Sequence, residues 1–103
     1  MGVASFDLYV PGMNFVFGEA RLLGRVSVIS TYRLKPLLSD DYILFQERVV
    51  KEAVHEIGHM LGMRHCTDHS CVMYFSESII DTDRKSSEFC RNCRSELKRL
   101  RVE

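Results

Sequence analysis

The first third of the chain is rich in β-branched and aromatic residues, and glycines and prolines interrupt these apolar runs. This pattern predicts three short strands, at residues 4–10, 14–20 and 25–32. A turn at Pro11-Gly12 ends the first strand. The second and third strands flank Leu22-Leu23-Gly24, a connection short enough to predict a hairpin or two tightly neighbouring strands.

A long helix is expected after Pro36. Ser39, Asp40 or Asp41 can cap its start, and it runs to about Leu61, a length of roughly 30 Å. Gly62 is a natural stop, because glycine is common just past the end of a helix.

Apolar and polar residues of this helix separate onto two faces. The face that we expect to pack on the sheet carries Val50, Ala53, Val54, Ile57 and Leu61. The opposite, polar face carries His55 and His59 together with Arg48, Lys51 and Glu52.

The remainder of the chain reads as less regular. After Gly62 we expect an irregular stretch, a polar loop at residues 76–88 and a short basic helix over about residues 90–101. The elements predict an α+β fold in a single domain over residues 1–103. Residues 1–62 form its sheet and long helix, and residues 63–103 its C-terminal part.

Composition narrows the function classes. The hydrophobic share is 46% and the charged share 27%, which is ordinary for a folded domain. Fourteen basic and fourteen acidic residues balance, so no overall charge attracts nucleic acid or a membrane surface. No apolar run is long enough to cross a bilayer, and no export signal precedes the first strand. We therefore expect a cytoplasmic protein with neither nucleic acid nor membrane as a partner.

The helix contains an HExxH motif, HEIGH, at residues 55–59. His55 and His59 stand one turn apart on one face, so their imidazoles can bind the same Zn²⁺. Glu56 between them can act as general base toward zinc-activated water. A bare HExxH also arises by chance on a solvated helix face.

The motif continues as HExxHxxGxxH, and the continuation makes chance a poor explanation. Gly62 can adopt a positive φ, turn the chain and return His65 to the same metal. Three nitrogen ligands leave one coordination position open, which distinguishes a catalytic zinc from a structural one. We expect His69, which lies outside this motif, to be a polar loop residue and not a zinc ligand.

Four cysteines form two close pairs, Cys66 with Cys71 and Cys90 with Cys93. The spacing predicts a closed Cys₄ zinc site, with buried thiols or a redox pair as alternatives. A chain this small has little core to stabilise it, so a metal crosslink would contribute to folding.

The run HEIGHMLGMRHCTDHSCVM, followed by CRNC, resembles the signature of the archaemetzincin family of metzincin zinc peptidases. The resemblance extends over essentially the whole chain. It implies a metzincin catalytic domain, in which a small twisted mixed sheet packs on the active-site helix and an irregular, zinc-stapled part with a short helix follows. It also implies hydrolysis of a peptide or protein substrate.

Carried over by position, the resemblance assigns two zinc ions per chain. The catalytic zinc would be bound by His55, His59 and His65, with Glu56 as general base. The structural zinc would be bound by Cys66, Cys71, Cys90 and Cys93. Met73 would lie beneath the catalytic zinc, residues 14–20 would form the edge strand along which substrate lies, and residues 74–80 would supply pocket walls.

Two departures from the family keep other functions open. Family members are longer at the N-terminus, so we expect an incomplete sheet and self-association. Phe75 stands where some metzincins carry a tyrosine near the zinc. The alternatives to a peptidase are an inactive zinc-binding remnant and a Cys₄ zinc module that binds through the basic C-terminal helix.

Overall fold

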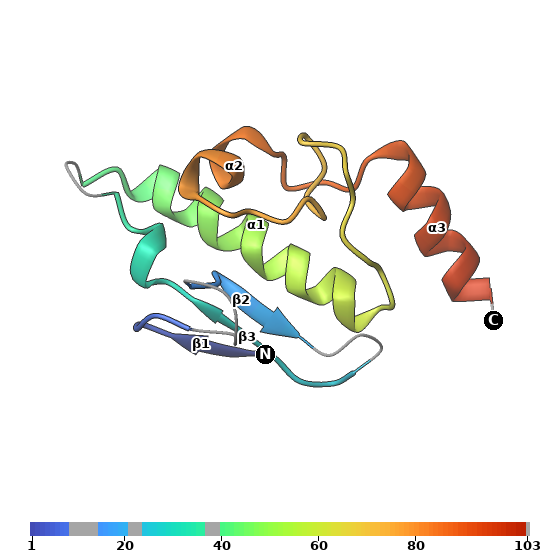
Figure 1. Cartoon of the computed structure of the whole chain (residues 1–103), viewed down its shortest axis with the longest axis horizontal. Helices are drawn as coiled ribbons and strands as arrows, with labels where there is room; N and C mark the ends of the chain where they lie inside the picture. Colours follow the sequence, from blue (N-terminus) through green and yellow to red (C-terminus); the bar gives the residue numbers. More distant parts are fainter. Residues whose placement is uncertain (9–14, 21–23, 37–39, 103) are drawn as a thin grey trace.

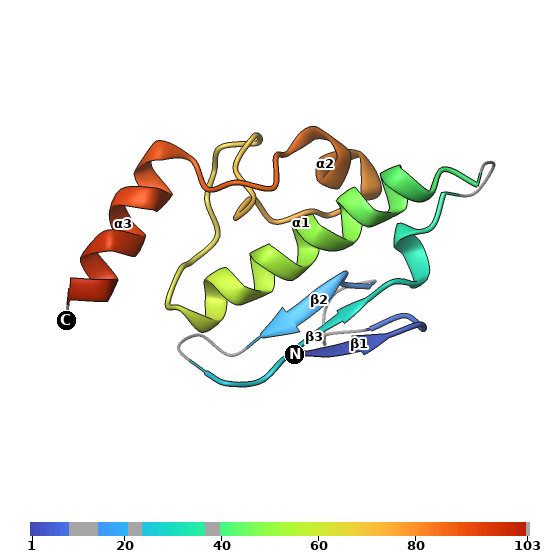
Figure 2. The ribbon, with the colours of Figure 1, turned by 180° about the vertical axis from the view of Figure 1, so that it is seen from behind.

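The computed structural model describes residues 1–8, 15–20, 24–36 and 40–102. Three strands form one mixed sheet in the order β1-β3-β2, with bounds β1 (Gly2–Ala4), β2 (Gly18–Ala20) and β3 (Ser27–Ser30). β1 pairs with β3 in parallel, whereas β2 pairs with β3 antiparallel. Helix α1 (Tyr42–Met60) crosses one face of this sheet (Figures 1 and 2). The predicted α+β class is therefore confirmed.

The strands are shorter than predicted. β1 begins earlier and ends at Ala4, because the chain bends there and Phe6 O accepts a hydrogen bond from Ser30 Oγ (2.6 Å). β3 ends at Ser30, since Tyr32–Leu34 forms a 3-10 turn, η1. The antiparallel pairing of β2 with β3 confirms that the second and third strands are close neighbours.

Several sequence predictions fall outside the described residues. They concern the ends of the first two predicted strands at residues 9, 10 and 14, the turn at Pro11-Gly12, Leu22-Leu23 in the connection, and Ser39 as a cap.

The ends of α1 follow the predicted signals. Asp41 is the N-cap, and its Oδ1 accepts a hydrogen bond from Leu44 N (3.0 Å). Leu61 closes the C-terminus, and Gly62 has a φ of 100°. This left-handed conformation is costly for any residue with a Cβ, so the glycine is needed for the turn that follows.

The orientation predicted for α1 is wrong. Val50 is 49% exposed, and Ile57 and Leu61 are each 44% exposed. The polar face lies inside instead, where Glu52 and His55 are each only 3% exposed. Figure 1 shows the reason, because α1 is covered on one side by the sheet and on another by the C-terminal segment that carries α2 (Ile79–Arg84).

Two buried charged residues of α1, Arg48 and Glu52, have partners far away in the sequence. Arg48 donates to both carboxylate oxygens of Asp83 (2.8 and 2.7 Å) and to Leu34 O (3.0 Å). Glu52 Oε1 lies 3.1 Å from the ammonium of Lys85. Paired charges can be buried at tolerable cost, and hydrophobic periodicity alone does not reveal such partners.

The C-terminal part contains one helix that the sequence did not predict. α2 lies within the stretch expected to be a loop, and Glu77 N donates to Asp81 Oδ2 (3.0 Å) just before it. The basic helix α3 (Arg91–Val102) agrees with prediction to within a residue at each end. No helix in the described part of the chain is long and apolar enough to span a membrane.

The main apolar cluster lies beside α1 and not within the sheet. Its buried members are Met63, Cys71, Val72, Met73 and Cys93. Phe89 and Leu97 pack against them with lower burial. The core of the C-terminal part therefore includes two of the four cysteines.

The exposed face of α1 gives a test of its orientation. Val50→Gln combined with Ile57→Gln should change the free energy of unfolding by less than about 1 kcal/mol, because surface substitutions have small effects. Val54→Gln should cost about 2 kcal/mol, since Val54 packs against the apolar cluster. Urea unfolding measures both. A double variant as unstable as Val54→Gln would contradict the observed orientation.

Candidate metal centre and active site

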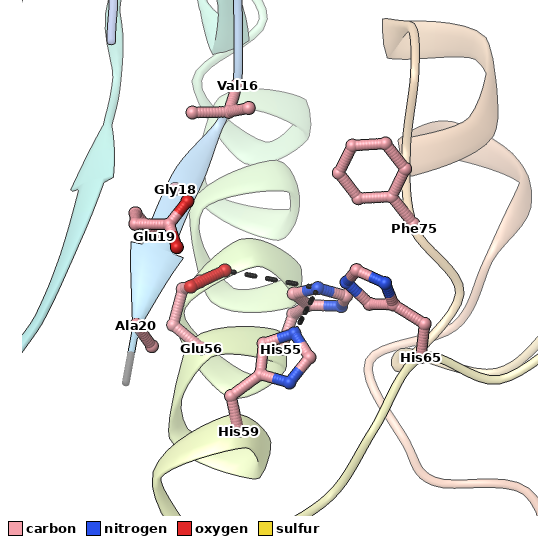
Figure 3. Close-up of a pocket in the computed structure, with 9 residues that line it drawn as sticks. All are labelled: Val16, Gly18, Glu19, Ala20, His55, Glu56, His59, His65 and Phe75. Carbon is pink, nitrogen blue, oxygen red and sulfur yellow. Dashed lines mark hydrogen bonds and ion pairs between the residues drawn. The ribbon is translucent and has the colours of Figure 1, made fainter. Parts of the chain in front are cut away.

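Three histidines converge at the C-terminal end of α1. The rings of His55 and His59 lie 4.7 Å apart on successive turns. Gly62 reverses the chain, and His65 returns to 5.3 Å from His55 and 4.7 Å from His59 between ring centroids. Their candidate ligand atoms all lie within 4.8 Å of one another. Figure 3 shows the three rings gathered at one end of the pocket.

Hydrogen bonds to the backbone fix two of these rings. His55 Nδ1 lies 2.8 Å from Val72 O, and His59 Nδ1 lies 2.8 Å from Met63 O. Because a carbonyl only accepts, each Nδ1 carries the proton and each Nε2 presents a lone pair. The two Nε2 atoms are 3.2 Å apart. Two ligands on a tetrahedral Zn²⁺ stand about 3.3 Å apart, so the residues fit a zinc ion.

The surroundings favour the neutral form of His55 and His65. Burial, together with the positive charge of Lys85, lowers the pKa of His55 to about 3. Burial also lowers the pKa of His65, which stands at the rim of the site. Neutral imidazole is the form that binds metal, so the environment favours the ligand state.

Glu56 projects from α1 beside the histidines. It is 3% exposed, and its Oε1 lies 3.9 Å from His55 Nε2. Its Oε2 has no hydrogen-bond partner among the described residues. Burial raises the pKa of Glu56 to about 8, with further contributions from Glu52 and Glu19, while Lys85 opposes them. A carboxyl group of this kind can accept and release a proton near neutral pH.

A cavity of about 390 Å³ connects these groups to the edge strand. Its lining comprises Val16, Gly18, Glu19, Ala20, His55, Glu56, His59, His65 and Phe75 (Figure 3). Space is tight where the strand meets the helix, because a Cβ on Gly18 would lie 2.9 Å from Val28 O and 3.0 Å from Glu56 Cδ. Glycine at this position lets β2 approach the carboxylate closely.

The segment after the third histidine packs against α1 and supplies one wall of the cavity. Met73 is fully buried, and a Cβ placed on Gly58 would collide with its Sδ. Met73 therefore packs directly against α1. Phe75 lies 4.9 Å from His65, ring to ring, so one predicted wall residue does line the cavity. His69 is exposed and packs on Tyr74.

The four cysteines form a second cluster beside the first. Cys66 Sγ lies 3.8 Å from Cys90 Sγ, and Cys71 Sγ lies 3.7 Å from Cys93 Sγ. These distances are too long for disulfides. They match the separation of about 3.8 Å between two sulfurs bound to one tetrahedral Zn²⁺. All four sulfurs lie within 4.8 Å of one another, so the residues fit a zinc ion here too.

Backbone amides point at these sulfurs. Cys71 Sγ accepts hydrogen bonds from Met73 N (3.4 Å) and Cys90 N (3.3 Å), and Cys90 Sγ accepts one from Cys93 N (3.5 Å). The bond from Cys93 N lowers the pKa of the Cys90 thiol. Burial raises the pKa of the Cys66 and Cys93 thiols. Such amide donors stabilise thiolates, which are the form that binds zinc.

Sequence reasoning missed several groups around the site. Val72 O, which orients His55, belongs to the backbone and leaves no signal in the sequence. Lys85 and Glu52 are 33 residues apart, so only the fold reveals that they pair. Glu19 lies in the strand expected to contact substrate, but nothing in the sequence indicated that it faces the cavity.

Comparison with known proteins gives one consistent answer. The sequence profile of peptidase family M54 matches residues 1–99. The archaemetzincin of Methanopyrus kandleri is 54% identical over 99 residues, which are 96% of this chain and 55% of that protein. The archaemetzincin of Archaeoglobus fulgidus is 54% identical over 98 residues, or 95% of this chain and 59% of that protein. The chain thus spans little more than half the length of these relatives.

Solved structures of archaemetzincins are also similar to this chain. The crystal structure of the M. kandleri archaemetzincin matches with a TM-score of 0.91 and 52% identity, covering 99% of this chain and 55% of that one. The A. fulgidus archaemetzincin, crystallised with malonate, matches with a TM-score of 0.85 and 56% identity, covering 92% and 58%. The fold described above is therefore shared with these proteins over nearly the whole of this chain.

The close approach at Gly18 predicts a sharp effect of one methyl group. Gly18→Ala should lower the free energy of unfolding by about 1–3 kcal/mol, because the added carbon overlaps backbone and the Glu56 side chain. Gly2→Ala is the matched control in β1, where the nearest atoms would be 3.8 Å away. Urea unfolding of both variants measures the difference. Equal stabilities would contradict the packing described.

The raised pKa of Glu56 predicts how metal-stripped protein responds to pH. Its folded pKa of about 8 exceeds the ordinary 4.5, so the folded state holds a proton that the unfolded state releases. Stability should therefore fall as pH rises through this range, by up to about 1.4 kcal/mol per pH unit. His55, with a folded pKa of about 3, acts in the opposite sense only below about 6.5. The loss from Glu56 therefore remains uncompensated by His55 between pH 6.5 and 8.

Glu56→Gln should remove this loss. We expect chelator-treated Glu56→Gln to gain stability relative to chelator-treated wild type as pH rises from 6.5 to 8 in urea unfolding. Glu47→Gln, an exposed substitution on the same helix, should retain the wild-type dependence. Parallel curves for Glu56→Gln and wild type would exclude a raised pKa at Glu56.

Proposed function

The chain belongs to peptidase family M54, and on this premise we propose that it is a zinc-dependent metallopeptidase that hydrolyses peptide bonds. One observation carries the proposal. The Nε2 atoms of His55 and His59 are turned toward one point, with protons held on the opposite nitrogens. His65 and the carboxylate of Glu56 flank the same point. We assign His55, His59 and His65 as zinc ligands.

Zinc bound there would act as a Lewis acid toward a carbonyl group and would lower the pKa of water toward about 7. Glu56 would serve as general base and would then return the proton to the leaving amine. Its Oε2 is available for this transfer within the described residues. Its burial supports a pKa that allows both steps near neutral pH.

The peptide would lie along β2. This strand is at the edge of the described sheet, and Gly18, Glu19 and Ala20 border the cavity. An extended peptide can add to such an edge through main-chain hydrogen bonds, which bring its carbonyl groups past the metal site. A second, structural zinc would be bound by the four cysteine thiolates, giving two zinc ions per chain.

Two further proposals concern where and how the chain works. Unpaired thiols serving as metal ligands are maintained in a reducing compartment, which supports a cytoplasmic location. The exposed apolar residues Ile43, Val50 and Ile57 of α1, together with Leu61 at its C-cap, support self-association. Light scattering of the wild-type chain and of the Val50→Gln, Ile57→Gln double variant measures self-association.

Zinc analysis combined with peptide cleavage tests the main proposal. We expect two zinc ions per chain and cleavage of a mixed peptide library. Glu56→Gln should retain both zinc ions and lower the cleavage rate by about 10²–10⁴-fold, because proton transfer is lost. Glu47→Gln, exposed on the same helix, is the control and should cleave normally.

Three other results would each contradict a different part of the proposed function. Two zinc ions without cleavage would favour an inactive zinc-binding remnant. Fewer than two zinc ions would overturn one of the two site assignments. Full activity in Glu56→Gln would exclude its role as general base.

A further inference from the structure

Lys85 is a buried cation beside the metal centre for which the proposed chemistry has no use. It caps the C-terminus of α2 and is only 1% exposed, the largest fully buried side chain among the described residues. An ammonium group is costly to bury, and an apolar side chain of similar volume commonly gives equal or greater stability. Its presence here therefore calls for an explanation from the contacts that it makes.

The ammonium group joins helix α1 to the segment of residues 72–75. Lys85 Nζ lies 3.1 Å from Glu52 Oε1 and donates to Tyr74 O at 3.0 Å. Thr82 Oγ1 also donates to Glu52 Oε1 (3.1 Å), which fixes the carboxylate from α2. Glu52 stands one turn before Glu56 on the buried face of α1. The lysine thus sets the distance between this helix face and Tyr74.

The segment that Lys85 holds contacts two histidines of the triad. Val72 O accepts the bond from His55 Nδ1 (2.8 Å), and the Phe75 ring lies 4.9 Å from that of His65. Figure 3 shows Phe75 above His65 on the wall opposite β2. Tyr74 O lies between these two contact points in the chain. A shift of the segment would therefore rotate the His55 ring and remove the packing of Phe75 on the His65 ring.

We propose that Lys85 is a positioning residue of the metal centre: by bridging Glu52 and Tyr74 O, it holds segment 72–75 where His55 and His65 meet one zinc ion. This inference rests on the proposed binding of zinc by the histidines. Groups that orient the ligands of a metal commonly change its affinity by about 10- to 100-fold when they are lost. The positive charge also acts directly on the site, since it lowers the pKa of both His55 and Glu56.

Two variants separate positioning from stability. Lys85→Met removes the ammonium and leaves the Glu52 carboxylate with its bond from Thr82 but without a counter-charge. Glu52→Gln combined with Lys85→Met removes both charges and keeps an acceptor for Thr82, so the fold should recover while Tyr74 O still lacks its donor. Lys51→Met is the matched control, because Lys51 Nζ also joins α1 to the α2 region, through Thr82 O (3.1 Å) and Asp83 O (3.4 Å), without touching segment 72–75.

The measurement is Co²⁺ binding to the histidine site in protein whose cysteine site holds zinc. Cobalt reports ligand geometry through its visible absorption, and cobalt bound by cysteine is distinguished by sulfur charge-transfer bands. We expect at least tenfold weaker binding and an altered spectrum for Lys85→Met and for the double variant. Lys51→Met should bind as wild type does. Thermal unfolding, followed in parallel, reports the fold of each variant.

Other results would contradict either the positioning role of Lys85 or the proposed function. Wild-type affinity and spectrum in the folded double variant would make Lys85 a residue of stability alone and overturn the inference. Loss of cooperative unfolding in both Lys85 variants, with Lys51→Met intact, would likewise assign it to the fold. A wild-type chain that binds no cobalt at its histidines would instead contradict the proposed function.

Discussion

The fold depends on burial of the polar face of α1. Arg48, Glu52, His55 and Glu56 all lie inside, and burying such a face is costly unless its permanently charged groups meet partners there. Asp83 and Lys85 supply two of these partners from the α2 region. The C-terminal segment is therefore an integral part of the fold. It provides the counter-charges that allow the polar face of the helix, with His55 and His59, to lie inward.

The sequence predicted the features of α1 that depend on neighbouring residues, but not its orientation, which depends on distant ones. The helix bounds and the turn at Gly62 depend on local residue chemistry, so the sequence was sufficient to predict them. The N-cap was narrowed to three neighbouring residues, of which the structure selects Asp41. The convergence of the histidines and of the cysteines also follows from spacing along the chain, and the structure brings both groups together. Orientation of α1 does not follow from local chemistry, because the partners of its charges are some 30 residues away.

Helix α2 and the short strands were missed for related reasons. A helix of six residues has too little hydrophobic periodicity to be recognised, and α2 is held by contacts with α1. Strand ends are determined by where pairing stops. Hydrogen bonds from Ser30 and Thr31 to Phe6 O and Ala4 O determine that point, and strand propensity does not encode them.

His65 and Cys66 are neighbours in the chain, so one peptide unit joins the histidine cluster to the cysteine cluster. This adjacency has a thermodynamic consequence. A zinc ion that binds only the folded chain stabilises it by about 4 kcal/mol when free zinc exceeds its dissociation constant a thousandfold. Small domains have total stabilities of about 5–15 kcal/mol. With zinc at the cysteines, the population of chains that present an ordered His65 would thus depend on the concentration of free zinc, and the metal supply would regulate how much competent protein exists.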